Sequence, residues 1–184
     1  MKNLNYLLIG FLFLFLAACE KDDPEIPNEE ELITTLTYTL TPQSGGDNVV
    51  LTFKDLDGDG GDAPEISSGI LAANTTYNGT LSLLNEQESP AEDITEEIEE
   101  EEDEHQFFFQ TTVNGVAINY DDADGDGNPI GLKTILSTGD AGSGTLSITL
   151  RHEPNKSASG VADGNIANAG GETDIEVTFN LDVQ

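Results

Sequence analysis

Nine short runs of strand-forming residues, separated by turn residues, constrain the fold of this chain more than any other feature of its sequence. In the run at residues 32–40, Leu36, Tyr38 and Leu40 alternate with threonines, which is the period-two pattern of a half-buried strand. Gly, Asn, Asp or Pro bounds the other runs, at residues 49–53, 66–71, 77–84, 107–113, 116–120, 132–136, 145–150 and 175–183. The runs therefore predict a mainly β fold, an antiparallel β-sandwich of about nine strands.

Two internal matches suggest that the sandwich consists of two related Greek-key halves, at about residues 32–88 and 105–153. Residues 53–60 (FKDLDGDG) resemble residues 120–127 (YDDADGDG). The sequence GTLS at residues 79–82 recurs at a similar offset further along the chain. Chance remains the alternative, because turns and strands draw on few residue types.

One short acidic helix is predicted between the halves, at about residues 90–104. The sequence Ser89-Pro90-Ala91-Glu92 is typical of a helix start, with a capping serine, a proline at the first position and a glutamate that completes a capping box. Ile94 and Ile98 are four residues apart and share a face that can dock on the sheets. Most other residues of the segment are acidic and repel one another, so we expect the last turn to fray.

Residues 1–18 have the layout of an export signal. Lys2 precedes an apolar run that is too short to span a bilayer, which needs about 20 residues. Leu16-Ala17-Ala18-Cys19 resembles the lipobox of bacterial lipoproteins. The resemblance implies that the signal peptide is removed before Cys19 and that this cysteine is acylated, for example with palmitate.

Residues 19–31 are acidic and contain two prolines, which predicts a flexible tether between the lipid and the fold. A single domain then covers residues 32–184 and ends with a strand at about 173–183. The start of the tether, Cys19-Glu20-Lys21-Asp22-Asp23, resembles the surface-export signal of Bacteroidota lipoproteins. That resemblance implies an outer-membrane protein anchored by lipid at the cell surface, and anchoring that faces the periplasm is the alternative.

The formal charge of −30, with only six Lys and Arg, excludes some partners and favours others. Such a field repels nucleic acid and attracts cations and basic proteins. We therefore expect no nucleic-acid partner, a membrane contact through the lipid anchor, and a protein or envelope ligand. The chain contains no nucleophile elbow, no phosphate-cradling loop and no Cys/His pair, so we do not expect an enzyme.

Two aspartate-rich loops are candidates for binding calcium as a cofactor, because alternate carboxylates in a glycine-rich loop can converge on a hard cation. The candidate ligands are Asp55, Asp57, Asp59, Asp62 and Glu65 in the first loop, and Asp122, Asp124 and Asp126 in the second. Both loops resemble the first half of an EF-hand loop, but their twelfth positions are Ile66 and Lys133 rather than glutamate. The pattern thus favours a calcium loop on a β scaffold, with ordinary Asp-Gly turns as the alternative.

The only two histidines form a second candidate metal site. His105 opens one strand and follows Glu104, whereas His152 closes another strand and precedes Glu153. In a Greek key the fourth strand lies beside the first, so both histidines should lie at one end of the domain. Two imidazoles and two carboxylates can hold zinc or copper. The alternative is that each histidine only pairs with a neighbouring acid.

Several segments together resemble a family of small lipoproteins from Bacteroidota, flavobacteria especially. They are the lipobox and residues 53–60, 71–79, 92–97, 104–109 and 151–156. Such proteins are often labelled as type 1 periplasmic binding fold. That fold has two α/β lobes and about twice this length, whereas the strand runs favour a single β-sandwich.

The family resemblance implies no established activity, so the functional prediction depends on the motifs. The leading hypothesis is a lipid-anchored cell-envelope protein that acts as a cation-stabilised binding or interaction module. One alternative is a transition-metal-binding lipoprotein that uses His105 and His152. Another is a structural surface protein with no small-molecule ligand.

Overall fold

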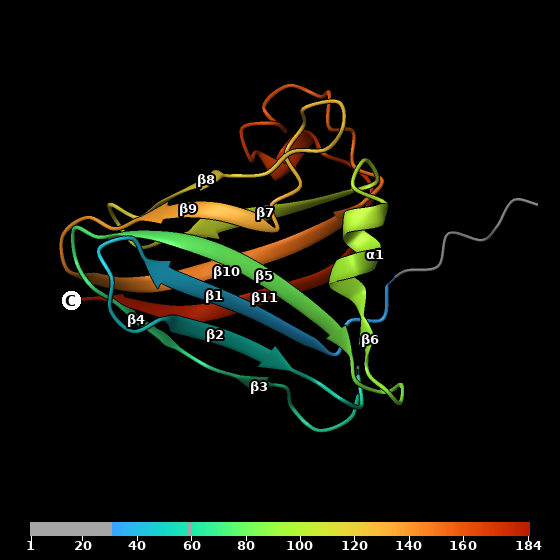
Figure 1. Cartoon of the computed structure of the whole chain (residues 1–184), viewed down its shortest axis with the longest axis horizontal. Coiled ribbons are helices and arrows are strands. Elements are labelled where there is room, and N and C mark those ends of the chain that lie inside the picture. Colours follow the sequence, from blue (N-terminus) through green and yellow to red (C-terminus); the bar gives the residue numbers. More distant parts are fainter. Residues whose placement is uncertain (1–30, 59) are drawn as a thin grey trace, which may run out of the picture.

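The computed structural model describes residues 31–58 and 60–184, which form two packed β-sheets with one helix at an end (Figure 1). The larger sheet has the strand order β3 (Glu65–Ile66), β2 (Val49–Lys54), β1 (Thr35–Pro42), β5 (Thr76–Asn85), β9 (Lys133–Ser137) and β8 (Ala117–Tyr120), and β6 (Glu92–Asp93) also pairs with β5. The smaller sheet has the order β4 (Gly69–Leu71), β11 (Glu172–Val183), β10 (Gly142–His152) and β7 (His105–Thr111). All pairs are antiparallel except β4 with β11. The prediction of a mainly β sandwich is confirmed.

The period-two pattern places the core between the sheets. In β1 the alternate residues Leu36, Tyr38 and Leu40 are fully buried, as predicted, and β11 buries every second residue from Ile175 to Val183. Residues from both sheets join in one large hydrophobic cluster, which also contains the two helix isoleucines. Burial of this shared face is the main force that holds the sheets together.

The described residues form eleven strands rather than about nine. The predicted run at residues 66–71 divides into β3 and β4, which belong to different sheets. The short strand β6 lies where the sequence predicted the start of the helix. The chain therefore crosses between the two layers at a place where the sequence showed one uninterrupted run.

In both predicted halves the first strand pairs with the fourth, β1 with β5 and β7 with β10. The order β5-β1-β2-β3 is a Greek key within the larger sheet. The second half differs, because β8 and β9 leave β7 and β10 and extend the larger sheet beside β5. A common origin of the two halves stays a prediction.

The helix α1 (Ile94–Glu100) is shorter than the predicted helix at residues 90–104. The predicted cap in Ser89-Pro90-Ala91-Glu92 is wrong. Asp93 is the N-cap instead and accepts a hydrogen bond from the amide of Thr95. Ile94 and Ile98 are buried, as expected, and the helix begins where the first of them can enter the core.

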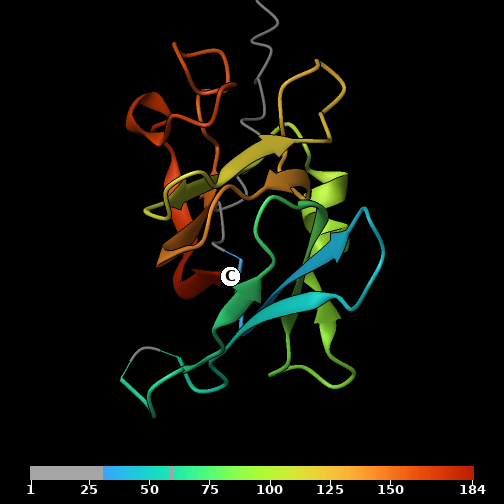
Figure 2. The same ribbon diagram turned by 90° about the vertical axis from the view of Figure 1, so that its left-hand side faces the viewer.

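The loop of residues 153–171 contains a short 3₁₀ helix, η1 (Ile166–Asn168), that the sequence did not indicate. Phe108, Val161 and Ala169 form a small second core beneath it. This loop, orange to red, lies on the same side of the molecule as the gold loop that follows β8 (Figures 1 and 2).

No helix among the described residues is long and apolar enough to cross a membrane.

Candidate metal centre

The two histidines lie side by side at the end of the smaller sheet nearest α1. His105 at the start of β7 and His152 at the end of β10 are direct partners in the antiparallel register. Their ring centroids are 4.6 Å apart, with an angle of 45° between the ring planes. Their expected position at one end of the domain, inferred from a Greek-key connection, is confirmed.

Both rings are buried, and the hydrogen bonding of His105 leaves one nitrogen available. Nδ1 of His105 lies 3.2 Å from the carbonyl oxygen of Glu101, which accepts a hydrogen bond when Nδ1 carries the proton. Nε2 of His105 is then an acceptor, and it is buried with no hydrogen-bond partner. A histidine that ligates a metal commonly donates its other N–H to such a carbonyl.

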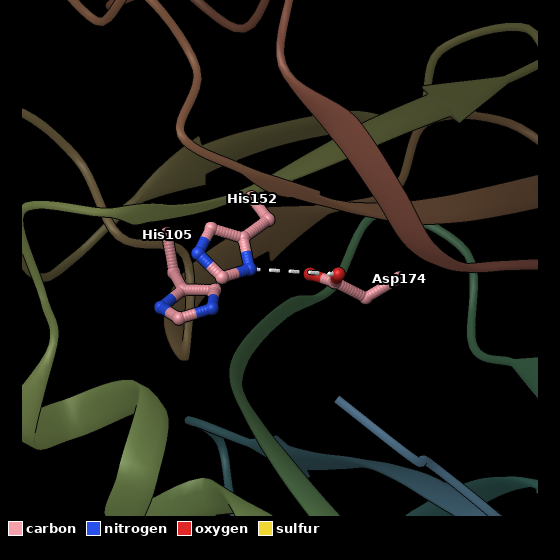
Figure 3. Close-up of side chains that lie close together, drawn as sticks. All are labelled: His105, His152 and Asp174. Carbon is pink, nitrogen blue, oxygen red and sulfur yellow. Dashed lines mark ion pairs between the residues drawn. The ribbon is translucent and has the colours of Figure 1, made fainter. Parts of the chain in front are cut away.

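A third side chain, Asp174, faces the histidines because β11 carries an irregularity at this point. Leu150 pairs with Ile175 but Arg151 pairs with Thr173, so Asp174 is an extra residue in the ladder. The bulge turns the Asp174 side chain inward, where it is 0% exposed, and one carboxylate oxygen lies 3.8 Å from Nδ1 of His152 (Figure 3). Sequence reasoning missed Asp174, since strict alternation with Ile175 places it outside.

The two acids that the sequence placed beside the histidines lie on the solvent side of the site. A carboxylate oxygen of Glu104 is 3.7 Å from Nε2 of His152, and its side chain is 49% exposed. Glu153 is also exposed, and its amide donates a hydrogen bond to the carbonyl of Glu104 at 2.7 Å. These acids therefore flank the outer edge of His152, and Asp174 flanks its inner edge.

The electrostatics of the site favour a neutral His105. Burial lowers the pKa of His105, and the nearby His152 lowers it further, although the hydrogen bond to Glu101 opposes the shift. Metal binding requires an unprotonated ring nitrogen. The burial that makes a charged His105 unfavourable thus keeps its lone pair available for an ion.

The ligand atoms of His105, His152 and Asp174 lie within 4.8 Å of one another. Ligands at about 2.0–2.1 Å from a tetrahedral zinc ion are about 3.4 Å apart, so a small rotamer adjustment closes the set. Two imidazoles and a carboxylate suit zinc or copper, whereas calcium takes 6–8 oxygen ligands. The arrangement can hold a transition metal ion, and the fourth position remains for water or another group.

The first aspartate-rich loop uses its carboxylates to stabilise its own turns. Asp55 accepts hydrogen bonds from the amides of Asp57 and Gly58, and Asp57 accepts one from the amide of Asp62. Glu65 is exposed at the start of β3, and Asp59 lies outside the described residues. Such contacts are typical of Asx turns.

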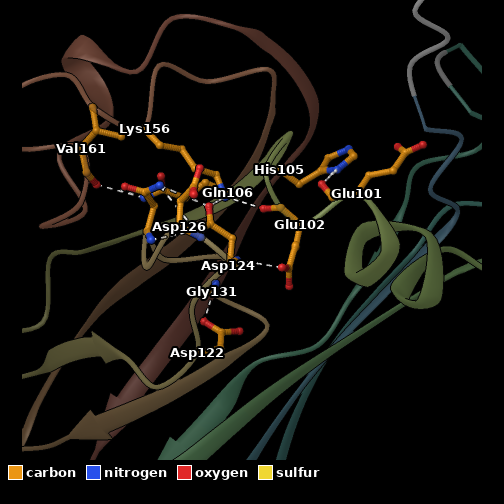
Figure 4. A network of polar contacts seen from close by, with 12 residues as sticks. Glu101, Glu102, His105, Gln106, Asp122, Asp124, Asp126, Gly131, Lys156 and Val161 are labelled. Carbon is orange, nitrogen blue, oxygen red and sulfur yellow. Dashed lines mark hydrogen bonds and ion pairs between the residues drawn. The ribbon is translucent and has the colours of Figure 1, made fainter.

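In the second loop, Asp124 pairs with a lysine from the loop of residues 153–171, where the sequence suggested a metal ion. Nζ of the buried Lys156 lies 2.9 Å from a carboxylate oxygen of Asp124 and also donates a hydrogen bond to the carbonyl of Glu102 (Figure 4). Asp122 instead accepts hydrogen bonds from the amides of Gly131 and Lys133, and Asp126 is exposed. An ammonium group therefore neutralises Asp124.

Among the described residues, which leave out Asp59, three groups of metal-binding side chains are close enough to share an ion. They are His105–His152–Asp174, Glu31–Glu101–His105 and Glu104–His152–Glu153. Both aspartate-rich loops are outside these groups, and calcium binding there stays a prediction. The predicted signal peptide, Cys19 and nearly all of the tether lie outside the described residues.

Comparison of this chain with models of known protein families, with curated proteins and with solved structures finds no match. The resemblance to small Bacteroidota lipoproteins is therefore carried by the sequence motifs alone. The geometry of the site is the remaining guide to function.

Proposed function

We propose that this chain is a lipid-anchored cell-envelope protein whose β domain binds a transition metal ion through His105, His152 and Asp174. The observation that carries the proposal is the buried contact between the two imidazoles, with Asp174 turned toward them by a bulge (Figure 3). The ion makes this protein a cation-stabilised binding module.

A bound ion resolves an energetic problem of the buried site. Nε2 of His105 and both ring nitrogens of His152 are buried without a hydrogen-bond partner. Each buried polar atom in that state costs about 1–3 kcal/mol. Coordination satisfies Nε2 of His105 and one ring nitrogen of His152, and it joins β7, β10 and β11 at this end of the smaller sheet.

The cellular setting of the proposal comes from the sequence. The lipobox at Cys19 and the acids that follow Lys21 support an outer-membrane lipoprotein with its domain at the cell surface. The strongly negative charge concentrates cations near the domain and favours basic envelope partners. If the protein binds no metal, the alternative of a structural surface protein with no small-molecule ligand applies.

A titration of the purified protein with Co²⁺ tests the proposal, because a tetrahedral Co²⁺ site absorbs visible light and zinc competes for it. We expect one ion per chain. Asp174→Asn, which keeps the side-chain volume, should weaken binding by at least about tenfold, since even outer partners of metal ligands commonly contribute 10–100-fold. Asp163→Asn, an exposed position with the same change of charge, is the matched control.

Equal binding by the Asp174→Asn protein and the control would contradict the assigned ligand set. Unchanged binding after substitution of both His105 and His152 by alanine would place the ion elsewhere. Absence of any Co²⁺ or Zn²⁺ binding would overturn the proposed function and favour a structural role.

A further inference from the structure

The ring of His152 faces a different set of carboxylates with each of its nitrogens. Nδ1 faces Asp174 inside the domain at 3.8 Å, and Nε2 faces Glu104 at 3.7 Å. The ligand atoms of Glu104, His152 and Glu153 lie within 4.8 Å of one another, and Nε2 is buried without a hydrogen-bond partner. One imidazole therefore separates an inner and an outer group of potential ligands.

The two groups differ in their access to solvent. The side chain of Asp174 is 0% exposed and that of His152 is 4% exposed, whereas that of Glu104 is 49% exposed. Glu104 and Glu153 are held next to each other by the hydrogen bond between their backbones. On the His152 side, an ion from solution thus meets Glu104 and Glu153 before it reaches Asp174.

We propose that Glu104, Glu153 and Nε2 of His152 form an outer, solvent-open subsite for a divalent metal ion, through which the ion enters and leaves the inner site. This inference rests on the proposed function. The exposed carboxylates capture a hydrated ion and lower the barrier to its dehydration, and the buried site then takes it.

The two tautomers of neutral His152 fit this sequence of steps. With the ion on Nε2, the ring proton is on Nδ1 and faces Asp174. With the ion on the inner side, the ring proton is on Nε2 and faces Glu104. In both states the ring keeps one N–H proton, and a carboxylate lies opposite that N–H. The change from one tautomer to the other takes place by exchange of this proton with solvent.

The test measures the rate of Co²⁺ uptake by stopped-flow absorbance and the rate of release to a chelator. The Glu104→Gln/Glu153→Gln protein should bind and release the ion about tenfold more slowly, because a local cluster of charge raises on-rates by 10-fold or more. The Kd of the inner site should stay unchanged. Glu99→Gln/Glu100→Gln, two exposed positions on α1 with the same change of charge, should keep the original rates.

Two outcomes would overturn the inference. A weaker Kd with an unchanged association rate would make Glu104 and Glu153 partners that position His152 for the inner ion. Equal slowing in the Glu99→Gln/Glu100→Gln protein would assign the effect to the general negative field.

A second measurement separates this subsite from the inner site. In the Asp174→Asn protein, added Mn²⁺ should still broaden the NMR signals of the His152 ring, and the further change of Glu104 and Glu153 to glutamine should abolish the broadening. No uptake of Co²⁺ by the unmodified protein would refute the proposed function. Absence of Mn²⁺ broadening would refute the outer subsite.

Discussion

Replacement of Lys156 by methionine should destabilise the domain strongly, although Lys156 lies on a surface loop. The Lys156 side chain is 6% exposed and that of Asp124 is 1% exposed, and their charged atoms are 2.9 Å apart. Lys156→Met keeps much of the side-chain volume but leaves Asp124 buried without its ammonium partner. The loop of residues 153–171 also loses one of its hydrogen bonds to the turn after α1, the bond from Lys156 to the carbonyl of Glu102.

The expected loss follows from the burial of this ion pair. Removal of one partner of a buried pair typically costs about 3–5 kcal/mol. Asp124 keeps hydrogen bonds from the amides of Asp126 and Asn128, so we expect a value near the lower end, about 3 kcal/mol. Burial alone would raise the pKa of Asp124, yet Lys156 and Asn128 hold this pKa below its usual value. The stabilisation of the folded state by the ionised Asp124 is therefore lost as the pH falls through the lowered pKa.

Urea unfolding at neutral pH measures the effect, and the chain contains a matched control. Lys54 and Glu86 are also 2.9 Å apart, but their side chains are 36% and 29% exposed. Lys54→Met should therefore cost only about 0.2–1 kcal/mol. Adding Asp124→Asn to Lys156→Met should restore part of the loss, because it removes the unpaired charge. A loss with Lys156→Met that is no larger than with Lys54→Met would refute the reasoning.

Other measurements test other parts of the molecule. Ile98→Ala should lower the free energy of unfolding by about 2–5 kcal/mol, since this fully buried side chain docks α1 on the core, and a much smaller loss in urea unfolding would contradict that docking. Burial and a hydrogen bond with Glu31 raise the pKa of Glu97 from 4.5 to about 7. The raised pKa lowers the stability of the folded state, and this loss is absent below pH 4.5 and grows as the pH rises to 7. Glu97→Gln should accordingly raise the melting temperature at pH 8 and leave it unchanged at pH 4, and an equal effect at both values would argue against the shifted pKa. Cys19→Ser should abolish labelling by a palmitate analogue and move the protein out of the membrane fraction, so label that persists on the variant would exclude Cys19 as the acylated residue. If the first aspartate-rich loop binds calcium, saturating Ca²⁺ at about 100 times Kd should stabilise the metal-free protein by about 2.7 kcal/mol and Asp57→Asn should weaken this, whereas an unchanged melting curve would exclude the site.

The sequence was sufficient to predict the histidine pair because strand pairing places the two residues opposite each other. Once the first and fourth strands of the predicted second half, β7 and β10, pair antiparallel, the start of one must lie beside the end of the other. Side-chain alternation likewise predicted which residues of β1 enter the core. These features follow from local periodicity and one topological rule.

The third residue of the site was beyond such reasoning, because it depends on a break in the periodicity. Asp174 faces His152 only because the register between β10 and β11 shifts by one residue after Leu150. The start of α1 was missed for a related reason, as both Ser89 and Asp93 can cap a helix, and tertiary burial of the helix selects between them. The partner of Lys156 is 32 residues away in the sequence and is fixed by loop packing alone.

The central place of β11 in the smaller sheet has a consequence for the order of folding. This strand, residues 172–183, lies between β4 and β10 and forms the only link between β4 and the rest of that sheet among the described residues. The pairing of β4 with β11 joins residues 112 positions apart, such as Gly69 and Leu181, and contacts of such high sequence separation form slowly. A chain still being synthesised therefore has an incomplete smaller sheet until residues 172–183 are available.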